Sequence, residues 1–149
     1  MMDIEVKKLA VGDVDDFICL VRVFEEVFEM IDFIMPPRDY LAALLQKDTF
    51  SAFVAIADDT IVAGLTAYTL DTYYTKGSYL YIYDLGVMVK YQRQGIGKTL
   101  IQGVIDSCKG TSVTEVFVQA DMADDDAVSF YRSTGGREEN VVGFSYLLL

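Results

Sequence analysis

Residues Tyr79–Leu100 read YLYIYDLGVMVKYQRQGIGKTL, and this stretch decides the fold. The first part, Tyr79–Val89, is almost entirely β-branched, aromatic or aliphatic, which is typical of a central strand covered on both faces. The segment Gln92–Gly97 then holds two glycines, which permit backbone conformations that other residues avoid and let a ligand come close. The stretch therefore predicts a strand that ends in a sharp turn.

A helix is predicted directly after this turn, because apolar residues recur at helical spacing. These residues are Ile96, Leu100, Ile101, Val104, Ile105 and Cys108. A helix that begins at a glycine turn directs several free N–H groups and the positive end of its dipole at one point. The sequence therefore predicts an anion site, most often one for phosphate.

Two common phosphate motifs do not fit the turn. Gly97-Lys98-Thr99 has the ending of a P-loop, but a P-loop needs a glycine five positions before Gly97, where this chain has Gln92. A dinucleotide fingerprint would need a third glycine at the position of Leu100.

The pattern that fits is Gln/Arg-x-x-Gly-x-Gly/Ala, which Gln92, Gly95 and Gly97 match. With these residues, and with Leu85-x-Val87 before the turn, the sequence resembles the GNAT superfamily of acetyl-CoA-dependent N-acetyltransferases.

The rest of the chain shows no repeat and no linker, and its patterns predict strands and helices in the order β-α-α-β-β-β-α-β-α-β. The resemblance implies that these form one GNAT domain over residues 1–149, an α+β fold with a central mixed sheet of six to seven strands and about four helices. Asp13 is expected to cap the first helix. The other strands are Ile4–Leu9, Phe50–Ala57, Ile61–Leu70, Val113–Ala120 and Gly143–Leu149, and the other helices are Asp13–Met30, Asp39–Gln46 and Asp124–Thr134.

Composition limits the function. The chain has 149 residues, a net charge of −11 and no histidine. Histidine bases and histidine metal ligands are therefore excluded, so a general base must be Asp, Glu, Tyr, a backbone group or a water. The charge disfavours nucleic acid and anionic membranes; it fits either a solubilising surface or a cleft that concentrates cations. No long apolar run or signal-peptide block appears, so we expect a cytoplasmic protein.

The resemblance implies the acetyl-CoA site. Strand residues Leu85, Gly86 and Val87 are expected beside the pantetheine arm. A second family signature, Ala127-x-x-Phe130-Tyr131, implies that Tyr131 donates a proton to the departing thiolate. Many members carry Asn at the CoA contact where this chain has Asp124. The expected contacts of the turn with the cofactor come from Gln92, Arg93, Gln94, Gly95, Ile96, Gly97 and Lys98.

A closer resemblance, to the type I aminoglycoside 3-N-acetyltransferases, lies in three segments: Tyr81–Val87, Arg93–Ile96 and Val118–Val128, with Arg137-Glu138-Glu139 after them. It implies acetylation of the 3-amino group of an aminoglycoside, hence antibiotic resistance, by a homodimer without a metal. Four positions depart from the expected pattern, in ways that could change the substrate: Gly86, Gly97, Asp126 and Gly136.

An acid-lined substrate site follows from that resemblance, because aminoglycosides carry several ammonium groups. The base is expected to be Asp84 or Asp121. Strict strand alternation places Asp84 on one face with Ile82, and Leu85 on the other face. The alternatives are an acetyltransferase for another amine, such as a polyamine or peptide, and a CoA-binding module without catalysis. The candidate substrate-binding residues are Tyr81, Tyr83, Asp84, Asp121, Asp124, Asp125, Glu138 and Glu139.

Overall fold

The computed structural model describes residues 2–149, which form two compact units. The first unit extends to Gln119, and the second is Ala120–Leu149. The second unit holds one helix, α4 (Asp125–Ser133). The first unit holds β1 (Ile4–Lys8), α1 (Val14–Val27), α2 (Arg38–Leu45), β2 (Phe50–Ala57), β3 (Thr60–Asp71), β4 (Ser78–Val87), a 3-10 turn (Val89–Tyr91), α3 (Ile96–Cys108) and β5 (Val113–Val118).

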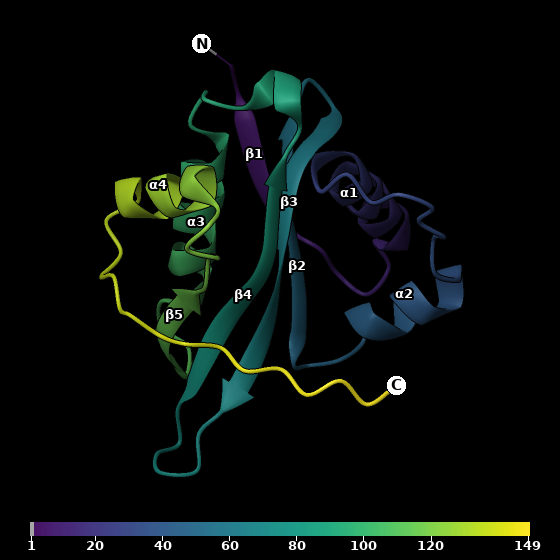
Figure 1. Ribbon diagram of the computed structural model, residues 1–149. Helices are drawn as coiled ribbons and strands as arrows, with labels where there is room; N and C mark the ends of the chain where they lie inside the picture. The colour runs from purple at the N-terminus through teal and green to yellow at the C-terminus, as the bar shows by residue number, and fades with distance from the viewer. Residues whose placement is uncertain (1) are drawn as a thin grey trace. The chain divides into compact units, whose positions relative to one another are not determined.

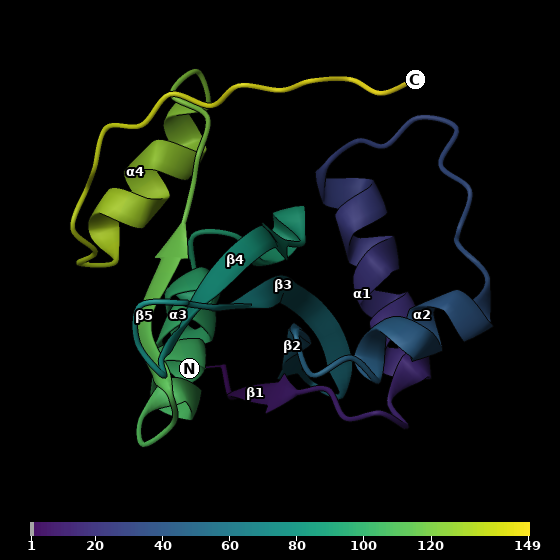
Figure 2. The same ribbon diagram turned by 90° about the horizontal axis from the view of Figure 1, so that it is seen from below.

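The first unit is built on a single mixed sheet with the strand order β1-β2-β3-β4-β5. The pairs β1–β2, β2–β3 and β3–β4 are antiparallel, and β5 runs parallel to β4. Helices α1 and α2 cover one face of the sheet, and α3 covers the other (Figures 1 and 2). The buried side of α3 is formed by Ile96, Leu100, Ile101 and Val104, as its apolar spacing predicts.

The predicted order of elements is confirmed as far as α4, but the strand count is wrong: the sheet has five strands, not six to seven. The predicted last strand, Gly143–Leu149, has no strand structure. A strand exists only through hydrogen bonds to a neighbouring strand, and none of residues 2–149 pairs with this segment. Its apolar side chains are instead exposed, Leu148 to 95%.

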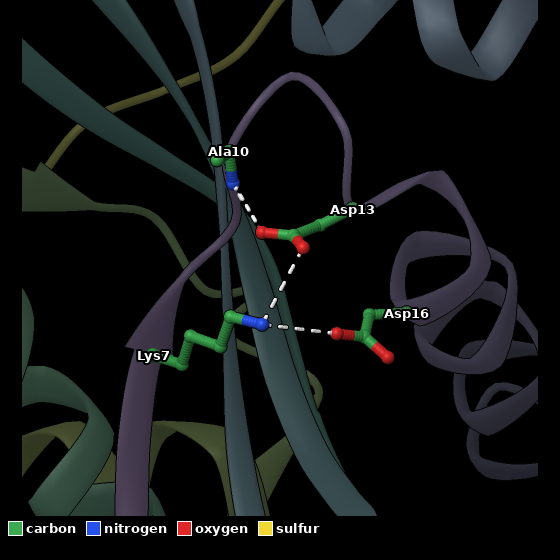
Figure 3. A network of polar contacts seen from close by, with 4 residues as sticks. All are labelled: Lys7, Ala10, Asp13 and Asp16. Atoms are coloured by element: carbon green, nitrogen blue, oxygen red, sulfur yellow. Dashed lines mark hydrogen bonds and ion pairs between the residues drawn. The ribbon is translucent and has the colours of Figure 1, made fainter.

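A polar network joins β1 to the start of α1 (Figure 3). The Lys7 ammonium lies 3.4 Å from an Asp13 oxygen and 3.2 Å from an Asp16 oxygen. Asp13 begins the helix but does not cap it with its side chain, because its carboxylate accepts the N–H of Ala10 at 2.7 Å. That hydrogen bond, more than the ammonium of Lys7, lowers the pKa of Asp13.

A β-bulge in β4 changes the expected faces of that strand. Ile82 pairs with Ala67 and Asp84 with Thr66, so Tyr83 is an extra residue without an opposite on β3. Because Thr66 and Ala67 are adjacent, their partners lie on opposite faces. The prediction that Asp84 shares a face with Ile82 is therefore wrong: Asp84 lies on the α1 side, and Leu85 on the α3 side.

No helix among residues 2–149 has the length and apolar character needed to cross a membrane.

Candidate active site

Strand β4 extends beyond its partner β5. The last parallel pair is Ile82 with Val118, whereas β4 continues to Val87. From Tyr83 onward, the backbone groups on the β5 edge of β4 therefore have no strand partner among residues 2–149. An unpaired strand edge offers donors and acceptors to another extended chain.

The turn after β4 is held by its own glutamines. The side-chain amide of Gln92 donates to the Val87 carbonyl at 2.9 Å, and that of Gln94 donates to the Lys90 carbonyl at 3.1 Å. Arg93 and Gly95 both have a left-handed backbone, with φ of 62° and 82°. The side chains of Gln92 and Gln94 are therefore hydrogen-bonded to the backbone of the residues just before the turn.

Helix α3 begins immediately after Gly95. Its first intrahelical hydrogen bond comes from the Thr99 N–H to the Gly95 carbonyl at 3.0 Å. The N–H groups of the preceding residues have no helical carbonyl to bind, which is the ordinary property of a helix start. Gly95 has open space around it, since a Cβ there would meet no atom within 4 Å. Gln92, Arg93, Gln94 and Lys98 are exposed, while Ile96 and Gly97 are buried in the helix base.

Asp84 is a half-buried carboxylate in the middle of β4. Within residues 2–149, no hydrogen bond or ion pair reaches its oxygens. Burial raises the pKa of Asp84, because the charged form loses hydration and gains no partner. A carboxylate in this condition has a stronger tendency to take a proton than an exposed one.

Tyrosine rings adjoin Asp84 on the same part of the sheet. Tyr83 packs edge-to-face with Tyr68 at 5.7 Å and with Tyr81 at 6.0 Å between ring centroids. Tyr81 also stacks on Phe117 at 4.7 Å, and its hydroxyl donates to Gln119 at 3.3 Å. Burial, more than the negative charges of Tyr83, Tyr40 and Asp84, raises the pKa of Tyr68.

The second unit holds the acidic run after β5. Asp121 Oδ1 accepts the Ala123 N–H at 2.8 Å, and Asp124 caps α4 by accepting the Ala127 N–H at 3.0 Å. Each of the two carboxylates thus accepts a backbone N–H of its own segment. A surface hollow of about 650 Å³ is lined by Asp121, Ala123, Asp124, Asp125 and Asp126.

The other predicted residues of the second unit are also located. Tyr131 is half-buried on α4, and its ring centroid lies 4.9 Å from that of Phe130. Arg132 binds both oxygens of Glu138, at 2.6 and 3.2 Å, and thereby lowers the pKa of that carboxyl. Arg137 binds Glu139 at 2.7 Å. Both glutamates therefore already have a cation beside them.

Of the predicted site, the first unit brings together Tyr81, Tyr83 and Asp84 beside the free edge at Leu85–Val87. Sequence reasoning missed Tyr68. Its place beside these residues depends on the register that pairs it with Tyr81, and no local pattern carries that information. No group of three or more His, Cys, Asp or Glu side chains within 2–149 is arranged to hold a metal.

Residues 20–135 match the acetyltransferase (GNAT) family, so the chain belongs to that family, whose members use acetyl-CoA. The fold and the family make it an N-acetyltransferase. A comparison with curated protein sequences gave no significant match.

The chain is also similar to several solved structures of aminoglycoside acetyltransferases. An aminoglycoside acetyltransferase from an uncultured soil metagenomic sample is 46% identical, with a TM-score of 0.95 over 98% of this chain and 97% of that one. Its structures contain trehalose or sisomicin. Another aminoglycoside acetyltransferase from such a sample is 32% identical, with a TM-score of 0.91 over 99% and 100% of the chains. The aminoglycoside N-acetyltransferase AAC(6')-Iy, in complex with CoA, is 16% identical with a TM-score of 0.77 over 100% and 97%, and shares the fold.

Proposed function

We propose that the protein transfers the acetyl group of acetyl-CoA to an amino group of an aminoglycoside, and that the 3-amino group is the acceptor. The observation that carries the proposal is the free edge of β4 from Tyr83 to Val87, directly before a helix start at an open glycine turn. The 46% identity to a sisomicin-bound aminoglycoside acetyltransferase supports this choice of substrate. The family match over 20–135 crosses the boundary at Gln119, which supports one functional domain over 1–149.

Acetyl-CoA occupies the edge and the turn in this proposal. The amide-rich pantetheine arm runs along Leu85–Val87 as an extra strand, and the pyrophosphate accepts N–H groups between Arg93 and Lys98. The side chains of Arg93 and Lys98 add positive charge. Asp124 is a further proposed contact of the cofactor, and one of its oxygens also caps α4 by accepting the Ala127 N–H.

Asp84 is the better of the two candidate bases. Its carboxylate has a raised pKa and no hydrogen-bond or ion-pair partner within residues 2–149, whereas an oxygen of Asp121 already accepts the Ala123 N–H at 2.8 Å. In the reaction, Asp84 takes a proton from the substrate ammonium, directly or through a water. The free amine then attacks the thioester carbonyl carbon, and a backbone N–H near Val87 stabilises the oxyanion. The tetrahedral intermediate then collapses: the C–S bond breaks, Tyr131 protonates the thiolate of CoA, and the nitrogen gives up its second proton to water as the amide forms.

The acidic run of the second unit attracts the substrate. Asp121, Asp124 and Asp125 lie at the hollow described above, where no basic side chain lines the surface. Glu138 and Glu139 contribute less, because Arg132 and Arg137 already pair with them. The net charge of −11 adds long-range attraction for a polycation.

A thiol-release assay with a panel of amines tests the proposal. We expect acetyl-CoA cleavage with gentamicin-like amines, with kcat/KM falling as salt rises, and little turnover of acidic or neutral amines. NMR of the product identifies the acetylated nitrogen. Turnover of peptides or linear polyamines alone would replace the aminoglycoside by another amine, and tight binding of acetyl-CoA without any turnover would indicate a binding module.

We also propose a cytoplasmic homodimer. The exposed apolar segment Gly143–Leu149 supports pairing, because Phe, Tyr and Leu side chains that extend into water gain from adding to the sheet of a second chain. Light scattering of the full chain, compared with a chain truncated after Asn140, measures this directly. We expect a mass of two chains for the first and a smaller mass for the second.

A further inference from the structure

The tyrosine cluster, defined as Tyr68, Tyr81 and Tyr83, lies near the Asp84 carboxylate and has no lysine or arginine over its rings within residues 2–149. Tyr83 is 58% exposed although it lies within a central strand. The β-bulge accounts for this, because it removes Tyr83 from the ladder that buries Leu80 and Ile82. Its ring is perpendicular to both neighbours, at 89° to Tyr68 and 86° to Tyr81.

The aromatic rings of the cluster and the Asp84 carboxylate are groups that bind ammonium ions, and no protein cation within residues 2–149 occupies them. The lysines that contact rings within residues 2–149 lie elsewhere: Lys8 over Phe53, and Lys90 over Tyr91. The oxygens of Asp84 likewise have no ion-pair partner among these residues. Ring faces carry negative potential and attract cations, most strongly where water is partly removed.

We propose that Tyr83, supported by Tyr68 and Tyr81, binds an ammonium group of the substrate against its ring face while Asp84 provides the counter-charge. This rests on the proposed function and adds to it a specificity-determining residue and a preference. Alkylated ammonium groups bind best, because they lose less hydration when they enter an aromatic site. The charge, and not the phenolic hydroxyl, is what Tyr83 recognises.

Three variants test the role of the ring in the full-length protein. Tyr83→Leu should raise the KM for the aminoglycoside roughly 2- to 30-fold. The KM for acetyl-CoA should stay unchanged. Tyr83→Phe keeps the ring and removes the hydroxyl, so it should raise the KM for the aminoglycoside far less than Tyr83→Leu does. Tyr73→Leu is the matched control, because Tyr73 is 98% exposed on a loop and contacts only the Tyr74 ring among the aromatic side chains. An unchanged KM in Tyr83→Leu, or an equal loss in Tyr83→Phe, would overturn the proposal.

Tetramethylammonium provides a second measurement that needs no turnover. It has the charge and methyl groups of the preferred ligand and no amine to acetylate, whereas tert-butanol has a similar shape and no charge. By saturation-transfer NMR we expect the methyl protons of tetramethylammonium to report binding in the wild type and in Tyr83→Phe, and weaker binding in Tyr83→Leu. Equal binding of tert-butanol would overturn the role of charge. If the amine panel shows no aminoglycoside turnover, the proposed function fails, and this measurement still decides whether the cluster binds ammonium.

Discussion

The two halves of β4 differ in what pairs with them. Residues Ser78–Ile82 have β3 on one side and β5 on the other, while Tyr83–Val87 have β3 alone. The first half carries Leu80 and Ile82, which are 4% and 1% exposed. The second half carries the bulge, the free edge and the Asp84 carboxylate, which has no hydrogen-bond or ion-pair partner within residues 2–149. One strand thus contributes to the core where both of its edges are paired, and leaves backbone donors and acceptors unpaired with a strand of residues 2–149 where one edge is open.

The largest effect should come from the second half of the strand. Asp84→Asn keeps the shape and removes the proposed base, so we expect kcat/KM to fall about 10²- to 10⁴-fold. Steady-state kinetics measure this, and the wild-type rate should rise with pH through a midpoint above 3.8, because the pKa of Asp84 is raised. Asp121→Asn is the comparison; a larger loss there would make Asp121 the base.

The same variant should be at least as stable as the wild type at pH 7. Because the pKa of Asp84 is higher in the folded than in the unfolded chain, its contribution to stability is complete below the unfolded pKa and is lost as pH rises through the folded pKa. Denaturant unfolding at pH 7 and below pH 4 should therefore show a difference between variant and wild type that shrinks in acid. A large loss of stability at pH 7 would mean that Asp84 has a structural partner.

The paired half of β4 should matter for stability instead. Ile82→Ala should lower the free energy of unfolding by about 2–5 kcal/mol, because a side chain 1% exposed leaves a cavity. Leu85→Ala, at a half-buried position three residues later, should cost less. Urea denaturation of both variants decides the point, and an equal or larger cost at Leu85 would contradict the contrast between the halves.

The smallest effect is expected at the turn. Gly95→Ala places a Cβ in open space at φ 82°, so its cost is the left-handed backbone, about 1–2 kcal/mol of unfolding free energy. Gly110→Ala, beyond the other end of α3, has φ 78° and equally open space, and should cost a similar amount. Only Gly95→Ala should also raise the KM for acetyl-CoA, as steady-state kinetics will show. An equal rise of the KM for acetyl-CoA in Gly110→Ala would show that the effect does not come from the turn at Gly95.

Local pattern predicted most of the elements, because periodicity and glycine turns are local properties. The predicted limits of β2, Phe50–Ala57, are those observed, and the apolar stripe of α3 is buried. The bulge could not be predicted, since it depends on which residue of β3 lies opposite Tyr83. The segment Gly143–Leu149 has the composition of a strand, yet composition does not supply a partner.

For the candidate site, the glycine turn lies where the strand–turn–helix pattern of Tyr79–Leu100 predicts it, and the free edge includes Leu85–Val87, which the family resemblance assigns to the pantetheine arm. The prediction that Asp84 shares a face with Ile82 was wrong because it assumed a regular strand, and the bulge at Tyr83 breaks that alternation. Tyr68 was missed altogether, because it is 13 residues from Tyr81 in the chain and adjoins it only through the hairpin register.

Tyr83 is the one residue between Ser78 and Val87 that the pairing of β3 with β4 skips, so its loss would remove the bulge and not the pairing. Ile82 would remain opposite Ala67 and Asp84 opposite Thr66, so Asp84 would keep the α1 side and Leu85 the α3 side. A chain that lacks Tyr83 should therefore keep the fold of the sheet and lose the exposed ring.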